Sequence, residues 1–477
     1  MSGRQTLLLV AIVLVGVAVA GPFVLGILTR AAVDDFVEMS NTTGDAELEV
    51  VEYEQGWFQS RMRVAVRFPE DEGSSIVFDH ALRHGPLLPA SECGNRFGFA
   101  LSTGHSSLNP VTPEIEHFLP GGRMSDDCLF IDFNGNVHAI QQVAAFAGSD
   151  FDAEGNLQGA STQVAWAPIS VDWTYLNETR PKLSGSMHVP SFSVSDTATH
   201  VQIDALTMRM DLRRAVLPEL WDGEVVIATE KLQTWESDTQ EPVSMHGFEM
   251  KMQAETGTVK AVFELSLAYE SVAANEREFG EGRWSLRFQD LGTPGIQAFN
   301  ERRESLLKAG IPQDSELYVQ AFREFMPEIL TTDPRVILDF TQAVENGLIS
   351  AKGYARITKP EVTASDDPRD WLTAVELDLS ISLPEWFLHD VLEGYQRSSL
   401  EASSEGKKLD PAILDLLLES QASAMLQGLE QAGYVQKREG AYRSRLYLRD
   451  GNATVNDQRI GNVVEMLLGG DSQPSPP

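Results

Sequence analysis

The residues that most resemble a metal or catalytic site in this sequence are two histidines and a pair of aspartates. His80 and His84 stand four positions apart, a spacing that puts two metal ligands on one side only in a helix. Their segment instead has strand character and runs into Gly85-Pro86, so we expect both imidazoles to be structural. Asp126-Asp127 fits a solvated turn better than a catalytic pair, which needs its two carboxyl groups in different environments. The sequence therefore predicts no catalytic residue, no metal site and no cofactor.

The lack of common catalytic motifs in the sequence and its overall charge argue against several classes of function. The sequence has no G-x-S-x-G, no P-loop and no dinucleotide-binding fingerprint. It has 70 acidic and 37 basic residues, a formal net charge of −33. Nucleic-acid binding requires clustered Lys and Arg, so this balance argues against a nucleic-acid partner. We interpret the acidic residues as a strongly solvated surface.

Cys93 and Cys128 are the two cysteines of the chain. An even number of cysteines in an oxidising compartment favours a disulfide, and the segment between them is rich in Gly, Pro, Ser and His. Two separate buried thiols are the alternative. A redox-active pair is disfavoured because the sequence has no C-x-x-C motif.

The N-terminal segment predicts a membrane anchor. Residues 5–29 carry no charge and are flanked by Arg4 and Arg30. About 20 apolar residues suffice for a helix to cross the hydrocarbon core, and Arg4 favours a cytoplasmic N-terminus. Ala18-Val19-Ala20 resembles a signal-peptide cleavage site, but the apolar run continues beyond it, so we favour an uncleaved anchor.

The stretch 51–68 begins the remainder of the chain with a strand pattern. Met62, Val64 and Val66 alternate with charged or small residues, the period-2 pattern of a half-buried strand. Residues 262–267, 284–288, 377–381 and 442–448 show further strands, with turn signals between them. In 201–212 the alternation slips by one residue at Leu206, which predicts a bulge.

Helical periodicity interrupts the strands in the second half of the chain. It predicts helices over 296–307, 317–330, 384–395 and from Pro411 to about 433. Pro327 is expected to kink or end the second of these near Met326. Asp410-Pro411 has the N-cap and N1-proline pattern of a helix start.

The expected fold is a β-rich α+β class: an N-terminal transmembrane helix, then a large curved, mostly antiparallel sheet with several packed helices. The expected divisions are a membrane anchor over 1–30, a β-rich region over 31–275, an α+β region over 276–468 and a disordered tail over 469–477. At 477 residues the chain exceeds the usual size of one compact core.

Several stretches, in order, resemble the YdgA-like family of bacterial envelope proteins, a domain family of unknown function. They include an N-terminal anchor, Asp79-His80, 282–286, 353–355 and 450–458, together with Tyr53, Gly56, Trp57, Phe58, Ser60, His84, Gly85 and Pro86. The resemblance covers nearly the whole chain and implies a single-pass inner-membrane protein whose body faces the periplasm. Cys93 and Cys128 do not belong to this pattern.

These observations predict a non-enzymatic envelope protein that acts by binding or scaffolding. Its partners would be the lipid bilayer, through the N-terminal helix, and a second copy or another envelope protein. A carrier of lipid or another apolar ligand is the alternative, because a curved sheet with one apolar face can hold an acyl chain. We expect Trp57, between Gly56 and the strand that follows, to be a core anchor of the first sheet.

Overall fold

The computed structural model of the protein describes residues 30, 47–67, 75–84, 87–88, 96–109, 119, 122–149, 163–195, 199–217, 220–236, 243–274, 277–309, 311, 315–360, 362, 367–403 and 411–462. The chain forms two compact units. Unit 1 comprises Met1–Ser244 and Arg302–Ser315, and unit 2 comprises Met245–Glu301 and Glu316–Pro477. The first boundary between the units lies at 244, and the divisions expected from the sequence, with a boundary at 275, stay a prediction.

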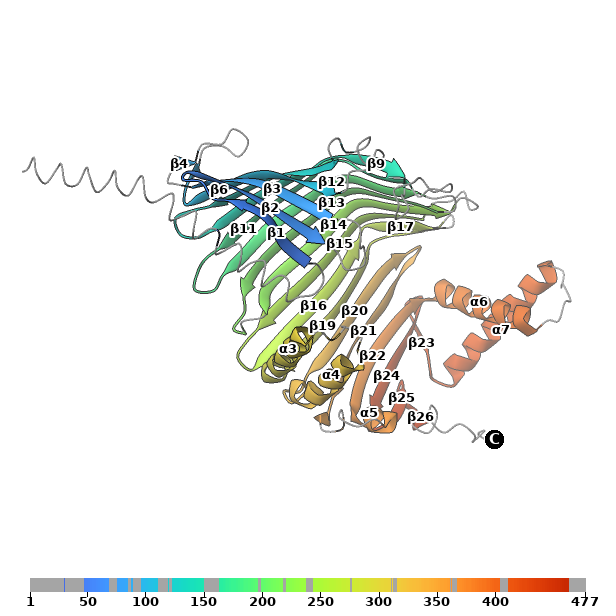
Figure 1. Ribbon diagram of the computed structural model, residues 1–477. Coiled ribbons are helices and arrows are strands. Elements are labelled where there is room, and N and C mark those ends of the chain that lie inside the picture. Colours follow the sequence, from blue (N-terminus) through green and yellow to red (C-terminus); the bar gives the residue numbers. More distant parts are fainter. Residues whose placement is uncertain are drawn as a thin grey trace, which may run out of the picture. The chain divides into compact units, whose positions relative to one another are not determined.

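Unit 1 is built from antiparallel strands, coloured blue to green in Figure 1. Its strands are β1 (Glu47–Glu54), β2 (Gln59–Arg67), β3 (Ser75–His84), β4 (Leu87–Leu88), β5 (Arg96–Phe97), β6 (Ala100–Asn109), β7 (Arg123–Ile131), β8 (Val137–Val143), β9 (Phe146–Ser149), β10 (Gln163–Trp166), β11 (Ile169–Leu176), β12 (Lys182–Ser195), β13 (Thr199–Arg214) and β14 (Trp221–Glu236). They pair in the order β1-β2-β3-β6-β7-β8-β11-β12-β13-β14. β10 pairs with both β9 and β12, and β4 with β5.

The bulge predicted near Leu206 is absent, because β13 keeps one register on both sides of the slip. Its pairing with β12 passes from Val189↔Leu206 to Ser191↔Asp204, so each strand skips one residue and neither has an extra one. Its pairing with β14 likewise keeps one register from Asp204↔Lys231 to Thr207↔Ala228. The slip in the sequence coincides instead with Ala205, whose φ of 53° lies in the left-handed region.

Unit 2 combines antiparallel strands with helices, coloured yellow-green to red in Figure 1. Its strands are β15 (Val243–Thr256), which begins at the division, β16 (Lys260–Tyr269), β17 (Ser271–Ala274), β18 (Arg277–Phe279), β19 (Gly282–Gly292), β20 (Arg335–Val344), β21 (Gly347–Ile357), β22 (Val375–Pro384), β23 (Gln436–Arg438), β24 (Ala441–Arg449), β25 (Asn452–Val455) and β26 (Gln458–Asn462). They pair in the order β15-β16-β19-β20-β21-β22-β24-β25-β26, with β17–β18 and β23–β24 as further pairs.

The described helices are α3 (Thr293–Lys308), α4 (Glu316–Ile329), α5 (Pro368–Ala374), α6 (Glu385–Ser403) and α7 (Pro411–Gln431). Each of the four predicted helices is present. α4 ends at Ile329, two residues after Pro327 and close to the predicted end near Met326, and Leu330 N still donates to Met326 O at 3.0 Å. α6 and α7 pack with β24 around the buried cluster Leu392, Ala422, Leu426 and Tyr442.

The β-rich class and the extensive antiparallel pairing confirm the predicted fold class in its coarse form. None of the helices in the described ranges has both the length and the apolar character that a bilayer crossing requires. The predicted span over 5–29 lies outside those ranges, as do the predicted tail over 469–477 and Asp410.

Candidate functional site

The two faces of the unit 1 sheet differ in chemistry, and one of them is charged. Residues directly opposite each other in antiparallel strands share a face, so the register assigns Arg61, Arg63 and Asp79 to the charged face. Arg61 Nη2 and Arg63 Nη2 lie 2.9 and 2.8 Å from Asp79 Oδ2. The hydrogen bond from Arg61 is the main cause that lowers the pKa of Asp79 to about 2. The charged face is solvated at these positions, whereas Leu101, Cys128 and Phe130 on the same face pack with Leu88 in a buried cluster.

The opposite face, here called the apolar face, extends across the unit 1 strands. One row of directly paired positions on it comprises Met62, His80, Gly104, Asp127, Gln141, Val171, Met187, Met208 and Ile227. Met187, Met208 and Ile227 are half-buried, whereas the inner face of a packed sandwich would bury them. Three neighbouring apolar residues that stay partly exposed on one surface are a feature of binding surfaces.

An apolar pocket lies on this face. It encloses about 200 Å³ and is lined by Leu108, Leu119, Met124, Val143, Ala144, Phe146 and Trp166. Trp166 stacks on Phe146 with ring centroids 4.5 Å apart, and its Nε1 donates to Ala144 O at 2.9 Å. The register irregularity between Ser106 and Ser107 leaves Met124 without a partner in β6, and a bulge of this kind redirects a side chain.

A polar cluster interrupts the apolar face beside this pocket. Its members are His80, Ser102, Ser106, Ser125, Asp127 and Gln141, and Ser125 pairs directly with Val143 of the pocket wall. Ser102 Oγ lies 2.8 Å from His80 Nδ1, and Ser125 Oγ donates to Asp127 Oδ1 at 2.8 Å. Ser106 Oγ and Gln141 Nε2 lie 2.6 and 3.1 Å from Ser125 Oγ.

One atom of the cluster lacks a hydrogen bond. Asp127 Oδ2 is buried and has no donor among the described residues. His80 Nε2 lies 3.7 Å from it, longer than a hydrogen bond. Burial lowers the pKa of His80, more than Asp127 raises it, so the imidazole is neutral near pH 7. The predicted turn at Asp126-Asp127 is wrong, because both residues lie within β7.

Gly104 creates the space in which His80 and Asp127 approach each other. It lies between them in the register, opposite His80 on β3 and opposite Asp127 on β7. A Cβ at this position would lie 2.7 Å from His80 Cγ and would also clash with the Asp79 carbonyl oxygen. The two polar side chains can therefore face each other across β6 only because no side chain projects between them.

The contacts of Ser102, His80 and Asp127 follow the order of a hydrolytic triad, but the setting does not suit acyl transfer. Ser102 is 4% exposed and lies in β6, which pairs on both sides. The N–H groups of such a strand are used in its ladders, so they cannot form an oxyanion hole. The described residues also contain no group of three or more His, Cys, Asp or Glu placed to hold a metal ion. The arrangement favours recognition of a polar group.

The structure brings two of the sequence-predicted motif residues together. Ser60 in β2 and His84 in β3 are 1% and 3% exposed, with Ser60 Oγ 2.9 Å from His84 Nε2. The expected structural role of His84 fits this buried hydrogen bond. Tyr53 is half-buried in β1, and Arg30 lies over its ring at 5.1 Å. Gly85 and Pro86 lie outside the described residues.

Trp57 is not the core anchor that the sequence predicted. Trp57 and Phe58 are 49% and 56% exposed, because they lie in the connection between β1 and β2, where no second layer covers them. Gly56 does not have a positive φ, but a Cβ there would clash with the carbonyl oxygen of Gln59. The conformation of the connection thus requires Gly56, while its aromatic residues face solvent.

Cys128, in β7, is disulfide-bonded and packs against the buried Leu88, Leu101 and Phe130. Cys93 lies outside the described residues, so the pairing of Cys93 with Cys128 stays a prediction.

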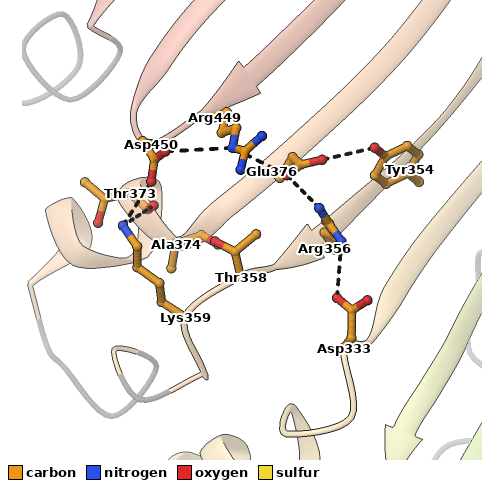
Figure 2. Close-up of polar contacts among 10 residues, drawn as sticks. All are labelled: Asp333, Tyr354, Arg356, Thr358, Lys359, Thr373, Ala374, Glu376, Arg449 and Asp450. Atoms are coloured by element: carbon orange, nitrogen blue, oxygen red, sulfur yellow. Dashed lines mark hydrogen bonds and ion pairs between the residues drawn. The ribbon is translucent and has the colours of Figure 1, made fainter.

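A second buried carboxylate, in unit 2, has a full set of partners (Figure 2). Glu376 of β22 is 3% exposed and accepts hydrogen bonds from Tyr354 Oη at 3.1 Å and Arg356 Nη2 at 2.9 Å. Arg449 Nε lies 3.9 Å from it. The hydrogen bond from Arg356 is the main cause that lowers the pKa of Glu376. This network links β21, β22 and β24, which is a structural role.

No motif in the sequence predicts the polar cluster. Ser102, Gly104 and Ser106 do share one phase of a strand, as do Ser125 and Asp127. Small polar side chains at every second position indicate that each strand has a polar stripe on one face. They do not indicate the register in which the two strands pair.

Comparison with known proteins places the chain in a family. No curated protein and no solved structure matches it. A family model described as a bacterial protein of unknown function (DUF945) matches residues 4–462. Since this match covers nearly all of the 477 residues, the chain belongs to the DUF945 family of bacterial proteins of unknown function.

Proposed function

We propose that the protein is a non-enzymatic envelope protein that binds a chain-like apolar ligand on the apolar face of unit 1. The observation that carries this proposal is the apolar pocket, which lies on the face that also carries the half-buried Met187, Met208 and Ile227. Enclosed ligand pockets usually measure about 300–1,000 Å³. A pocket of about 200 Å³ holds one end of an acyl chain, and the apolar face provides contact for the rest.

The location of the protein is part of the same proposal. The uncharged segment 5–29 would anchor the chain in the inner membrane, with the body in the periplasm. The YdgA-like motifs are compatible with membership of DUF945 and support this envelope assignment. An anchor that precedes unit 1 closely in the sequence would keep the apolar binding face near the bilayer.

Photo-cross-linking of the full-length chain tests the proposal. An alkyl probe carrying a diazirine should label peptides that contain Met124, Phe146 and Trp166. Ala144→Trp should fill the pocket and abolish this labelling, whereas Ala145→Trp should leave it unchanged, because Ala145 is exposed and does not line the pocket. Labelling that is absent in the wild type, or equal in the two variants, would overturn the proposal.

A scaffolding role is the second candidate, and the exposed Trp57-Phe58 pair favours it. Adjacent exposed aromatics are typical of a protein contact. Under this hypothesis the double variant Trp57→Ala, Phe58→Ala would keep the wild-type melting temperature and lose its chemical cross-links to other envelope proteins. Retained cross-links would exclude this contact.

A further inference from the structure

The polar cluster indicates what kind of apolar ligand the proposed site would take. A wholly hydrocarbon ligand would gain nothing from His80, Ser102 and Asp127 on the apolar face, and burying an unpaired carboxylate oxygen carries a cost in stability. The cluster adjoins the pocket, since Ser125 of the cluster pairs with Val143 of the pocket wall. A ligand whose tail lies in the pocket therefore has its polar end within reach of the cluster.

The donors and acceptors of the cluster match a hydroxyl group. The neutral imidazole of His80 carries one N–H, and we assign it to Nε2, because the acceptor Asp127 Oδ2 faces this atom while Nδ1 can accept from Ser102 Oγ at 2.8 Å. The His80 Nε2–H is then a donor that faces Asp127 Oδ2, an acceptor, 3.7 Å away. An oxygen lying about 2.8 Å from each atom fits this separation and can accept from one while donating to the other.

The same geometry disfavours a carboxylate headgroup. A ligand carboxylate has acceptors only, so it would leave Asp127 Oδ2 unpaired and would place a second negative charge beside it. Both side chains are 12% exposed on this face, so small movements of their neighbours would admit a ligand oxygen. The charge of the headgroup therefore separates hydroxyl-headed ligands, which fit the cluster, from carboxylate-headed ligands, which do not.

We propose that the ligand is a hydroxyl-headed amphiphile, whose hydroxyl bridges His80 Nε2 and Asp127 Oδ2 while its acyl or alkyl chain enters the pocket. This inference rests on the proposed function, because it assumes that unit 1 binds an apolar chain.

Competition against the diazirine probe in the full-length chain tests the inference. 1-Dodecanol should displace the probe at a concentration lower than dodecanoate by about 10-fold or more, the size expected for one hydrogen bond to a charged group. Asp127→Asn should reduce this preference to about 3-fold or less, because the amide no longer repels a carboxylate. Asp126→Asn is the matched control and should keep the wild-type ratio, because Asp126 lies on the charged face with its side chain 57% exposed.

The outcomes separate the two proposals. No labelling of the wild-type pocket overturns apolar-ligand binding itself. Labelling that both competitors displace equally, or a ratio that Asp127→Asn leaves unchanged, overturns the hydroxyl assignment and leaves apolar binding in place. A preference that falls equally in Asp126→Asn also overturns it, because general charge would then explain the selectivity.

Discussion

Asp127 in unit 1 and Glu376 in unit 2 are both acidic residues with buried carboxylate oxygens in antiparallel sheets, and they differ in how those oxygens are partnered. Tyr354 and Arg356 hydrogen-bond Glu376, with Arg449 close by. Asp127 has one hydroxyl donor, on Oδ1, and its Oδ2 has none among the described residues. The first group is arranged to stabilise its ionised form, and the second is left incomplete.

The difference teaches how a structural charge can be told from a binding charge. Breaking a buried, paired charge is costly because the partners lose their counter-ion, so such a pair fixes neighbouring strands to one another. A buried acceptor without a donor costs stability in the free protein, and a ligand that supplies the donor recovers that cost. The two sites should therefore respond in opposite ways to removal of the charge.

Removal of the Glu376 carboxylate should have the largest effect. Glu376→Ala leaves Arg356 without its main acceptor, and we expect a loss of about 3–5 kcal/mol in the free energy of unfolding of unit 2. Hydrogen exchange of peptides from β21, β22 and β24 in denaturant measures this loss. Asp339→Asn is the control, because Asp339 is 48% exposed and its pair with Lys352 should contribute at most about 1 kcal/mol. Equal losses in the two variants would contradict the comparison.

Filling the gap between His80 and Asp127 should have the next largest effect. Gly104→Ala places a Cβ against the His80 ring and the Asp79 carbonyl, and overpacking of this kind costs about 1–3 kcal/mol. Thermal denaturation of the full-length chain should show a lower melting temperature. Gly394→Ala in α6 serves as the control, since a Cβ there meets no atom within 4 Å and should be neutral or stabilising. A neutral Gly104→Ala would show that the cluster is not held by this close approach.

The two units should lose stability in different pH ranges. The pKa of His80 in unit 1 is lowered mainly by burial, whereas the pKa of Glu376 in unit 2 is lowered mainly by a hydrogen bond. Burial is the main cause that lowers the pKa of His80, and His105 lowers it further while Asp127 and Asp79 raise it. Below the unfolded value, about 6.5, the unfolded chain therefore binds a proton that the folded chain resists, so stability falls as the pH falls. For Glu376 the folded pKa is lowered, so its contribution is complete above about 4.5 and is lost only below that.

Hydrogen exchange of the full-length chain at pH 7.5 and 5.5 checks this difference. Peptides from β3, β6 and β7 should lose protection at the lower pH, and peptides from β21, β22 and β24 should keep theirs. His80→Gln should reduce the loss in unit 1 without removing it, because burial also lowers the pKa of His84. Parallel losses in both units would mean that neither group controls the response in this range.

The sequence predicts elements better than it predicts faces and neighbours. The alternation in 62–66 and the helical stripes each report a local period, and each corresponds to an observed element. The slip at Leu206 marks a local irregularity, the left-handed Ala205, but its predicted cause, a bulge, is absent because a bulge depends on the register with neighbouring strands.

The site could not be predicted in the same way because it depends on register. His80, Gly104 and Asp127 come from three strands and meet only when β3, β6 and β7 pair in one register. A shift of one residue would move Asp127 to the charged face. The prediction that Trp57 is a core anchor was wrong for a related reason. Aromatic residues are buried on average, but the connection that carries Trp57 leaves its side chain 49% exposed.

The smallest expected effect on stability belongs to Asp127→Asn, and it is the sharpest test of the comparison. In the wild type, Ser125 Oγ donates to Asp127 Oδ1 at 2.8 Å, and the amide oxygen of the variant can accept the same hydrogen bond. The variant also no longer buries a charged group with one oxygen that lacks a donor. We expect a change of less than about 1 kcal/mol in the free energy of unfolding, with either sign, measured by hydrogen exchange of β6 and β7 peptides. A loss as large as that of Glu376→Ala would show that Asp127 is a structural charge like Glu376. A small change would instead establish that Asp127 can be altered without disturbing the sheet, so that any effect of Asp127→Asn on ligand preference reports on recognition itself.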